Sequence, residues 1–353
     1  MNIKISGVGS YIPTTVQLNE EFSNHEFFNN DGSKFEQENN VIIEKFKAIT
    51  GICERRYAKE HHTTSDIAYF AADNAIKNAE IDPETIDYII VAHNFGDVKH
   101  NTIQSDMVPS IAARVKHSLG IENPKCVAYD LIFGCPGWVE GVIHAKAFIK
   151  SGMAKRCLVI GAETLSRVVD KHDRDAMIFS DGAGATIIEE TSEDCGILSN
   201  ETATFSSKEA YYLEMGSSYN SSSSHDDVRY IKMLGRKIYE FGCLKVPQAM
   251  KECLDNSGYT ISDVKKIFIH QANEKMDEAI IKRFYKQYKE SVPENIMPMC
   301  IQKLGNSSVA TIPTLLDLVN QGKIEGHSIE KGDIIMFASV GAGMNINAIT
   351  YKV

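Results

Sequence analysis

Three residues of this chain, a cysteine, a histidine and an asparagine, have side chains able to take part in acyl transfer. Cys135 lies in the stretch LIFGCPGW, His270 follows Ile267–Ile269, and Asn306 stands in the stretch GNSS. A thiolate attacks acyl carbonyl groups, an imidazole moves protons, and an amide donates hydrogen bonds to developing charge. These three residue types suit nucleophilic chemistry on thioesters if the fold brings them together.

Each of the three residues also has an ordinary structural interpretation. A free cysteine is among the most buried residue types, so Cys135 alone would be read as a structural thiol. His270 could simply satisfy hydrogen bonds, and Asn306 could be a helix N-cap. The setting of Cys135 favours a functional role, because Gly134, Pro136 and Gly137 predict a tight strand-to-helix turn.

The surrounding elements predict an α/β layered fold. Apolar runs rich in valine and isoleucine suit strands buried on both faces. They are Tyr88–Ala92, Cys157–Ile160, Ala185–Ile188, Ile267–Ile269 and Ile334–Phe337. Amphipathic stretches between them predict helices over Asp66–Ala79, Val139–Lys150 and Phe241–Ser257.

A weak internal repeat predicts two related halves. Asn78–Ala92 resembles Asn256–His270 at a constant offset, each reading as helix end, turn and buried strand. The stretches that open at Cys135 and at Asn306 also correspond. The repeat places both residues at matching helix N-termini, where free N–H groups hold an oxyanion and lower a thiol pKa. His270 would lie beside them at a strand end.

A polar, serine-rich stretch at residues 216–227 is the predicted boundary between the halves. We therefore expect an N-terminal half over 1–215, carrying the cysteine, and a C-terminal half over 216–353, carrying the histidine and asparagine.

Composition excludes several classes of protein. The 353 residues are 43% hydrophobic and 24% charged, as in ordinary globular proteins. A net charge of −10 argues against a nucleic-acid partner. The eight cysteines show no zinc-site spacing, and no apolar run is long enough to cross a membrane. Without a leader-like start, these features predict a cytoplasmic protein with reduced thiols.

Several motifs in order along the chain resemble β-ketoacyl-acyl-carrier-protein synthase III, a thiolase-like condensing enzyme. They include Ile5–Pro13, Thr50–Arg56, Cys135, Gly161–Arg167, Phe179–Ala185, His270–Asn273 and Gly305–Ser308. The resemblance implies a five-layered αβαβα fold of two duplicated halves, and a homodimer. Thiolases resemble this fold but use a second cysteine where Asn306 stands. Chalcone-synthase-like enzymes share Cys-His-Asn, yet their other motifs are less similar.

The resemblance implies a mechanism in two half-reactions. Cys135 takes the acyl group from an acyl-CoA or acyl-carrier protein, with backbone N–H groups of Cys135 and Ala342 holding the oxyanion. His270 and Asn306 then stabilise the enolate formed when a malonyl-type thioester loses carbon dioxide in fatty acid biosynthesis. No metal or redox cofactor is implied.

The substrate-binding positions depart from the family in part. Arg174 matches a nucleotide-binding arginine, and Asn273 ends the His270–Asn273 string. Val108 stands where a phenylalanine often lines the neighbouring subunit's pocket, and Phe133 replaces small residues. Lys45 and Ile49 replace a tryptophan and an arginine that hold coenzyme A.

Two acidic residues, Glu240 and Glu274, replace basic ones near the expected entrance. They either weaken attraction to acidic carriers or are plain surface residues. The segments 19–46 and 94–109 are longer than usual, and the first could be an entrance or dimer element.

Three alternatives to this function remain open at the level of sequence. A specialised relative, similar to dialkylresorcinol or flexirubin synthases, would join two acyl chains. Another enzyme of this fold would transfer the acyl group without decarboxylation. A non-catalytic subunit would only bind acyl chains, although the complete Cys-His-Asn set argues against that.

Overall fold

The apolar runs of the sequence form the central strands of two sheets in the computed structural model, which describes residues 1–220, 222 and 227–353. These strands are β4 (Tyr88–Ala92), β8 (Arg156–Thr164), β9 (Asp181–Thr191), β13 (Val264–Ile269) and β14 (Ile334–Gly341). β14 is buried along its whole length. All five strand predictions are confirmed, because layers on both faces of a sheet select continuous apolar strands.

The four strands of the second sheet repeat the order of four of the five strands of the first. The first runs β1-β9-β8-β4-β7, with β1 at Asn2–Tyr11 and β7 at Val127–Leu131. The second runs β10-β15-β14-β13, with β10 at Gly196–Thr204 and β15 at Asn345–Lys352. β4 pairs in parallel with β8, which pairs antiparallel with β9. In the same way β13 pairs in parallel with β14, which pairs antiparallel with β15. The predicted duplication is therefore confirmed.

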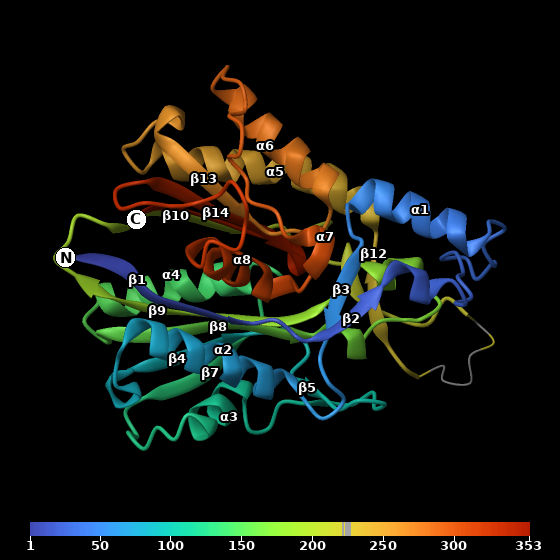
Figure 1. The fold of residues 1–353 in the computed structure, drawn as a ribbon, viewed down its shortest axis with the longest axis horizontal. Coiled ribbons are helices and arrows are strands. Elements are labelled where there is room, and N and C mark those ends of the chain that lie inside the picture. Colours follow the sequence, from blue (N-terminus) through green and yellow to red (C-terminus); the bar gives the residue numbers. More distant parts are fainter. Residues whose placement is uncertain (221, 223–226) are drawn as a thin grey trace.

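Helices form the remaining layers (Figure 1). α2 (Thr64–Ala79) and α3 (Ile111–Ser118) cover the outer face of the first sheet. α5 (Gly235–Asp255) and α6 (Glu274–Gln287) cover the outer face of the second. Between the sheets lie α4 (Gly137–Lys150) and α8 (Thr311–Asn320). This is the expected αβαβα arrangement.

The central layer holds the two halves together. One buried cluster joins Trp138 and Val142 of α4 and Leu315 of α8 to strand residues of both sheets, such as Ile90 and Phe337. Nearly every residue of α8 is buried, because both of its faces meet a sheet. The loops that enter α4 and α8 are therefore fixed against each other.

The change from one sheet to the other comes earlier in the chain than predicted. β9 ends at Thr191 and β10, which begins at Gly196, already belongs to the second sheet. The predicted boundary at residues 215 and 216 instead falls at the end of β11 (Leu213–Gly216), which pairs with β12 (Tyr230–Met233). The polar stretch joins a hairpin within the second half. Its residues 221 and 223–226 lie outside the described residues.

The region 15–57, which contains the long segment 19–46, forms a small layer of its own beside the sheets. It contains β2 (Thr15–Leu18), α1 (Asn39–Thr50) and β3 (Glu54–Tyr57). Its phenylalanines and isoleucines pack on Met177 and on Ile301 of α7 (Ile301–Leu304). The other long segment contains the short hairpin β5 (Asp97–Val98) and β6 (Ser105–Asp106). None of the helices in the described ranges is long and apolar enough to cross a membrane.

Candidate active site

Cys135 lies in the tight turn between β7 and α4. Gly134 has a φ of +67°, a conformation that favours glycine, and a Cβ there would lie 2.7 Å from the Ala342 nitrogen. α4 begins at Gly137 with Pro136 as N-cap. The predicted turn is confirmed, and it places the cysteine side chain on a cavity between the two halves.

Asn306 lies on the strand-like stretch that follows α7. Its backbone N–H donates to the Ile178 carbonyl and its carbonyl accepts from the Ser180 N–H, both at 2.9 Å. The side-chain Oδ1 accepts from the Ser308 N–H at 2.8 Å, which fixes the direction of the Nδ2 donor. Asn306 is less close to its helix than predicted, because the 3-10 turn Ser308–Ala310 precedes α8.

His270 follows β13 directly, and its backbone N–H donates to the Ala338 carbonyl at 2.9 Å. The side chain is buried, and its Nδ1 has no hydrogen-bond partner among the described residues. Burial lowers the pKa of His270 to about 4, while contact with the Ser308 backbone partly offsets the shift. The imidazole is therefore neutral near pH 7 and able to accept a proton.

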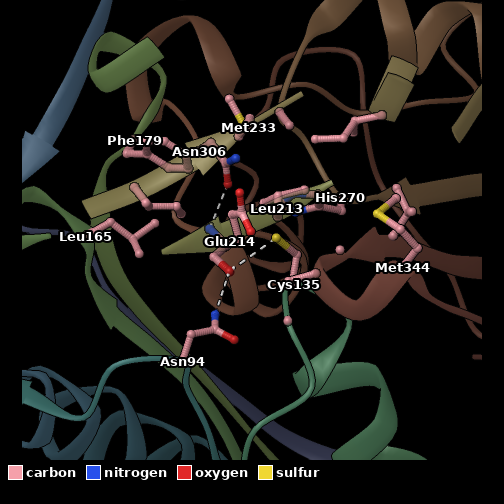
Figure 2. A pocket seen from close by; sticks show the side chains of 18 of the residues that line it. Asn94, Cys135, Leu165, Phe179, Leu213, Glu214, Met233, His270, Asn306 and Met344 are labelled. Carbon is pink, nitrogen blue, oxygen red and sulfur yellow. Dashed lines mark hydrogen bonds between the residues drawn. The ribbon is translucent and has the colours of Figure 1, made fainter. Parts of the chain in front are cut away.

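The three residues line one cavity of about 210 Å³ (Figure 2). Most of the remaining lining is apolar and includes Leu165, Phe179, Leu213, Met233 and Met344. The structure thus brings together the side chains that the repeat placed side by side. An apolar cavity that ends at a cysteine fits an acyl chain attached to its sulfur.

The resting protonation state of Cys135 differs from the expected one. Burial raises the pKa of this thiol to about 11, although a hydrogen bond from Ser308 acts in the opposite direction. The lowered pKa expected at a helix N-terminus is therefore wrong for this chain. Cys135 and His270 rest as a neutral thiol and a neutral imidazole, and the thiol loses its proton during attack.

The two backbone amides expected to form an oxyanion hole lie on adjoining turns. Their close approach depends on glycine, because a Cβ on Gly341 would lie 2.4 Å from the Cys135 nitrogen. Asn345 holds both turns, donating from Nδ2 to the carbonyls of Phe133 at 3.1 Å and Ala342 at 2.9 Å. The geometry suits two N–H groups directed at one oxygen atom.

Comparison with known proteins decides the family. The model for 3-oxoacyl-[acyl-carrier-protein (ACP)] synthase III matches residues 129–205, and the model for its C-terminal part matches residues 254–353. A beta-ketoacyl-[acyl-carrier-protein] synthase III of Oceanobacillus iheyensis is 35% identical, with 100% of this chain and 99% of the relative covered. The chain belongs to this synthase III family.

Further relatives agree over the whole length. A synthase III of Prochlorococcus marinus is 32% identical over 100% of this chain and 97% of its own. The crystal structure of the Aquifex aeolicus enzyme has a TM-score of 0.80 at 29% identity, covering 99% of this chain and 100% of that chain. The predicted family and thiolase-like fold are confirmed, and the protein is an acyl-transferring enzyme of the synthase III type.

Two of the predicted substrate-binding residues lie in a depression next to the cavity. Arg174 and Asn273 line it together with Phe35 of the segment 19–46 and Ile49 of α1. Met233 lines both the depression and the cavity, so the two adjoin. The Arg174 guanidinium lies 5.3 Å from the Phe35 ring centre and its side chain is 55% exposed. Phe35 of the long segment 19–46 thus borders this depression, while Asn273 caps α6 through its Oδ1.

The other two predicted substrate-binding residues do not line the cavity in the described part of the chain. Val108 is 87% exposed on the loop before α3. Phe133 is half-buried and meets the site through its carbonyl, which Asn345 holds. A role for Val108 in a pocket therefore needs a second subunit, as the family pattern suggested.

The two acidic substitutions have different surroundings. Glu240 is 60% exposed and pairs with Arg236 at 2.9 Å, as a surface residue would. Glu274 accepts from Gln302 Nε2 at 2.8 Å and packs so closely on Gly51 that a Cβ there would lie 2.1 Å from its carboxylate. Glu274 therefore joins α6 to the end of α1 and is not a plain surface charge.

Sequence analysis missed several residues of the site. Asn94 contacts both Glu163 and Ser308, next to Cys135. The β11–β12 hairpin supplies Leu213 and Met233 to the cavity. The signal for Asn94 is a polar residue just after a buried strand. The signal for Glu163 is an acidic residue inside an apolar strand. Nothing local marks the hairpin, which the serine-rich composition made resemble a linker.

Proposed function

We propose that this enzyme transfers an acyl group from a thioester to Cys135 and then condenses it with a malonyl-type thioester. The observation that carries the proposal is the shared cavity, where a thiol, an imidazole and a fixed amide meet at the end of an apolar space. The chemistry of the family and the geometry of this chain both support the role proposed for each residue.

In the first half-reaction, the Cys135 sulfur bonds to the acyl carbon as its proton passes to His270. The imidazole is neutral before this step, because burial lowers its pKa to about 4, and the negative charge that forms on the acyl oxygen favours its protonation. The N–H groups of Cys135 and Ala342 hold the oxyanion. The carrier thiolate then leaves and takes up the proton, so that neutral His270 is restored.

In the second half-reaction, His270 and Asn306 donate hydrogen bonds to the thioester carbonyl of the malonyl group. Loss of carbon dioxide leaves an enolate, whose carbon attacks the acyl carbon on Cys135. The carbon–sulfur bond breaks and Cys135 leaves as a thiolate, which is then reprotonated. Each enolate donor is expected to contribute about 2.7–4 kcal/mol to transition-state stabilisation. The scheme uses no metal or redox cofactor.

We propose acyl-CoA or acyl-carrier protein as the donor, with its carrier arm entering along the depression that contains Arg174. Arg174 offers a cation there to a phosphate, and Arg236 lies on the same rim. Ile49 is 52% exposed where the family has an arginine, so this chain holds a nucleotide with fewer charges. We expect weaker discrimination in favour of coenzyme A than in relatives that keep both residues.

Intact-mass analysis tests the loading step. The protein is incubated with acyl-CoA and acyl-carrier protein of graded chain length, and Cys135→Ala is compared with Cys300→Ala. We expect an acyl adduct on the Cys300→Ala control and none on Cys135→Ala. An adduct of equal yield on Cys135→Ala would disprove the assignment.

Product analysis after adding malonyl-carrier protein tests the second step. A β-ketoacyl product and released carbon dioxide support the proposal. A product of two joined acyl chains, or acyl transfer without carbon dioxide release, would contradict it in favour of the other condensing or transferring functions. No adduct on any donor would favour an acyl-binding subunit.

We further propose that the enzyme is a homodimer built across the edge of the first sheet. β7 is the terminal strand of that sheet, and a free strand edge pairs readily with another chain. Val127 of β7 is 46% exposed, and Ile132, which follows the strand, is 61% exposed. Val108 is exposed as well. A second copy would cover these apolar side chains and bring Val108 toward a neighbouring cavity.

We also propose a cytoplasmic location. All eight cysteines are free thiols in the structure, which suits a reducing compartment. The proposed carriers are supplied in the same compartment as the chemistry that consumes them. Fractionation with antibodies against the native protein checks this assignment.

A further inference from the structure

The hydroxyl of Ser308 contacts the sulfur of the proposed nucleophile. Its Oγ donates to Cys135 Sγ at 3.3 Å, and the residue is buried. The backbone of Ser308 has a φ of +52°, unusual for a residue other than glycine. This conformation places its N–H on Asn306 and its hydroxyl on Cys135. One strained residue thus contacts all three site residues, because its backbone also contacts His270.

A serine hydroxyl has a single proton, so its orientation decides whether it stabilises a thiolate. The side-chain Nδ2 of Asn94 lies 3.3 Å from Ser308 Oγ and can only donate there. Ser308 Oγ must accept that bond, which leaves its own proton for the sulfur. The bonds that link Asn94 to Cys135 in this way are drawn in Figure 2.

The orientation of the Asn94 amide is fixed in turn by Glu163. Both the backbone N–H and Nδ2 of Asn94 donate to Glu163 Oε1, at 2.7 and 2.6 Å. Glu163 is fully buried on β8, so its position is set by the first sheet. The chain of contacts Glu163–Asn94–Ser308 therefore connects the first sheet to the sulfur through a loop of the second half.

We propose that Asn94 is a positioning residue that holds the Ser308 hydroxyl as a hydrogen-bond donor to Cys135 and so stabilises its thiolate. The inference rests on the proposed role of Cys135 as nucleophile. The thiolate forms twice in the cycle, during attack on the donor and when the condensed product leaves. Asn94 acts at both points without touching substrate.

The test compares Asn94→Ala, Ser308→Ala and the double variant with wild type. The rate of alkylation of Cys135 by iodoacetamide is followed against pH, with the modified peptide identified by mass. We expect each single variant to raise the midpoint by about one pH unit, which is about a tenfold loss of thiolate. The double variant should match Ser308→Ala, because Asn94 acts through that hydroxyl.

Glu163 is a titratable group that raises the pKa of Cys135, His270 and Glu214 line the same cavity as the thiol, and none of the three is substituted. Substitution of Asn94 removes its side-chain hydrogen bond to Glu163, one of the interactions that lower the pKa of that carboxyl group, while the backbone N–H bond stays. A more neutral Glu163 would lower the pKa of Cys135, so this side effect opposes the expected shift and cannot imitate it.

Asn74→Ala is the matched control, since Asn74 is exposed and donates to the Ser10 carbonyl away from the site. Asn94→Leu keeps a similar volume without N–H donors and replaces the alanine variant if that fails to fold. A midpoint for Asn94→Ala equal to the control, or a further shift when it is added to Ser308→Ala, would overturn the inference. The assay needs no acyl donor, so a failure of wild type to become acylated would instead count against the proposed function.

Discussion

Substituting alanine for Gly341 tests the proposed oxyanion site by displacing it without removing any polar group. Gly341 has an extended backbone, with φ of −167°, so alanine causes no torsional strain there. Its Cβ would lie 2.4 Å from the Cys135 nitrogen and 2.6 Å from Pro136 Cδ. Both neighbours belong to the turn that carries the nucleophile, and neither is the end of a flexible side chain.

The contact sets the size of the expected effect. Ordinary contacts of a Cβ begin at 3.4 Å, so the two turns must separate by about 1 Å. A displacement of that size at reacting groups costs about 100-fold in rate. Overpacking a buried site costs about 1–3 kcal/mol of unfolding free energy. We therefore expect a folded, somewhat less stable enzyme that acylates Cys135 about 100-fold more slowly.

Single-turnover acylation, quenched at intervals and read by intact mass, measures this rate at saturating donor. Gly152→Ala is the matched control, because Gly152 follows the far end of α4 with φ of +77° and no atom within 4 Å of a Cβ. It costs stability through backbone strain, about 1–2 kcal/mol, without moving the site. Urea unfolding of both variants confirms that they are comparably destabilised.

A Gly341→Ala enzyme that acylates within threefold of Gly152→Ala would refute the reasoning. That result would mean that the amides of Cys135 and Ala342 do not need their observed approach, and that the oxyanion is held elsewhere. If acylation were slowed equally in both variants, the loss of rate would be due to lower stability alone.

Three further predictions concern other parts of the molecule. Asn306→Ala should slow condensation about 100-fold to 1000-fold while leaving self-acylation within a few fold, and equal losses in both half-reactions would contradict its role. Burial raises the pKa of Glu163 to about 7, so its contribution to stability is present below pH 4.5 and is lost as pH rises through 7. Between pH 4.5 and pH 8, the free energy of unfolding of Glu163→Gln, measured with urea, should therefore rise by up to about 3 kcal/mol relative to that of wild type. A difference between the two proteins that does not change with pH would count against a buried charge at this position. Ile132→Asp should convert the proposed dimer to monomers in light scattering, whereas an unaltered dimer mass would mean that the interface lies elsewhere.

Much of the fold was predictable because its signals are local. Continuous apolar runs identified the central strands, since strands covered on both faces must be apolar along their length. The repeat between Asn78–Ala92 and Asn256–His270 predicted two related sheets, and the four strands of the second repeat the order of four strands of the first. The glycines around Cys135 predicted the turn that the structure shows, because few other residues tolerate its φ.

Less of the site was predictable, because hydrogen-bond partners and burial depend on segments distant in the sequence. Asn94 meets Glu163 and Ser308 across 69 and 214 positions of the chain, and no local pattern records either contact. The serine-rich stretch was mistaken for a boundary because composition does not say which sheet its flanking strands join.

The sequence by itself determined which residues carry the chemistry and that two related halves present them. Residue type and order are enough for this, since Cys135, His270 and Asn306 each stand in a recognisable motif and these motifs occur in order. Only the tertiary structure decided the protonation states of Cys135 and His270 and the contacts that hold the three side chains in place. Desolvation by both halves makes Cys135 a resting thiol and His270 a neutral imidazole, reversing the charge state expected from a helix N-terminus alone.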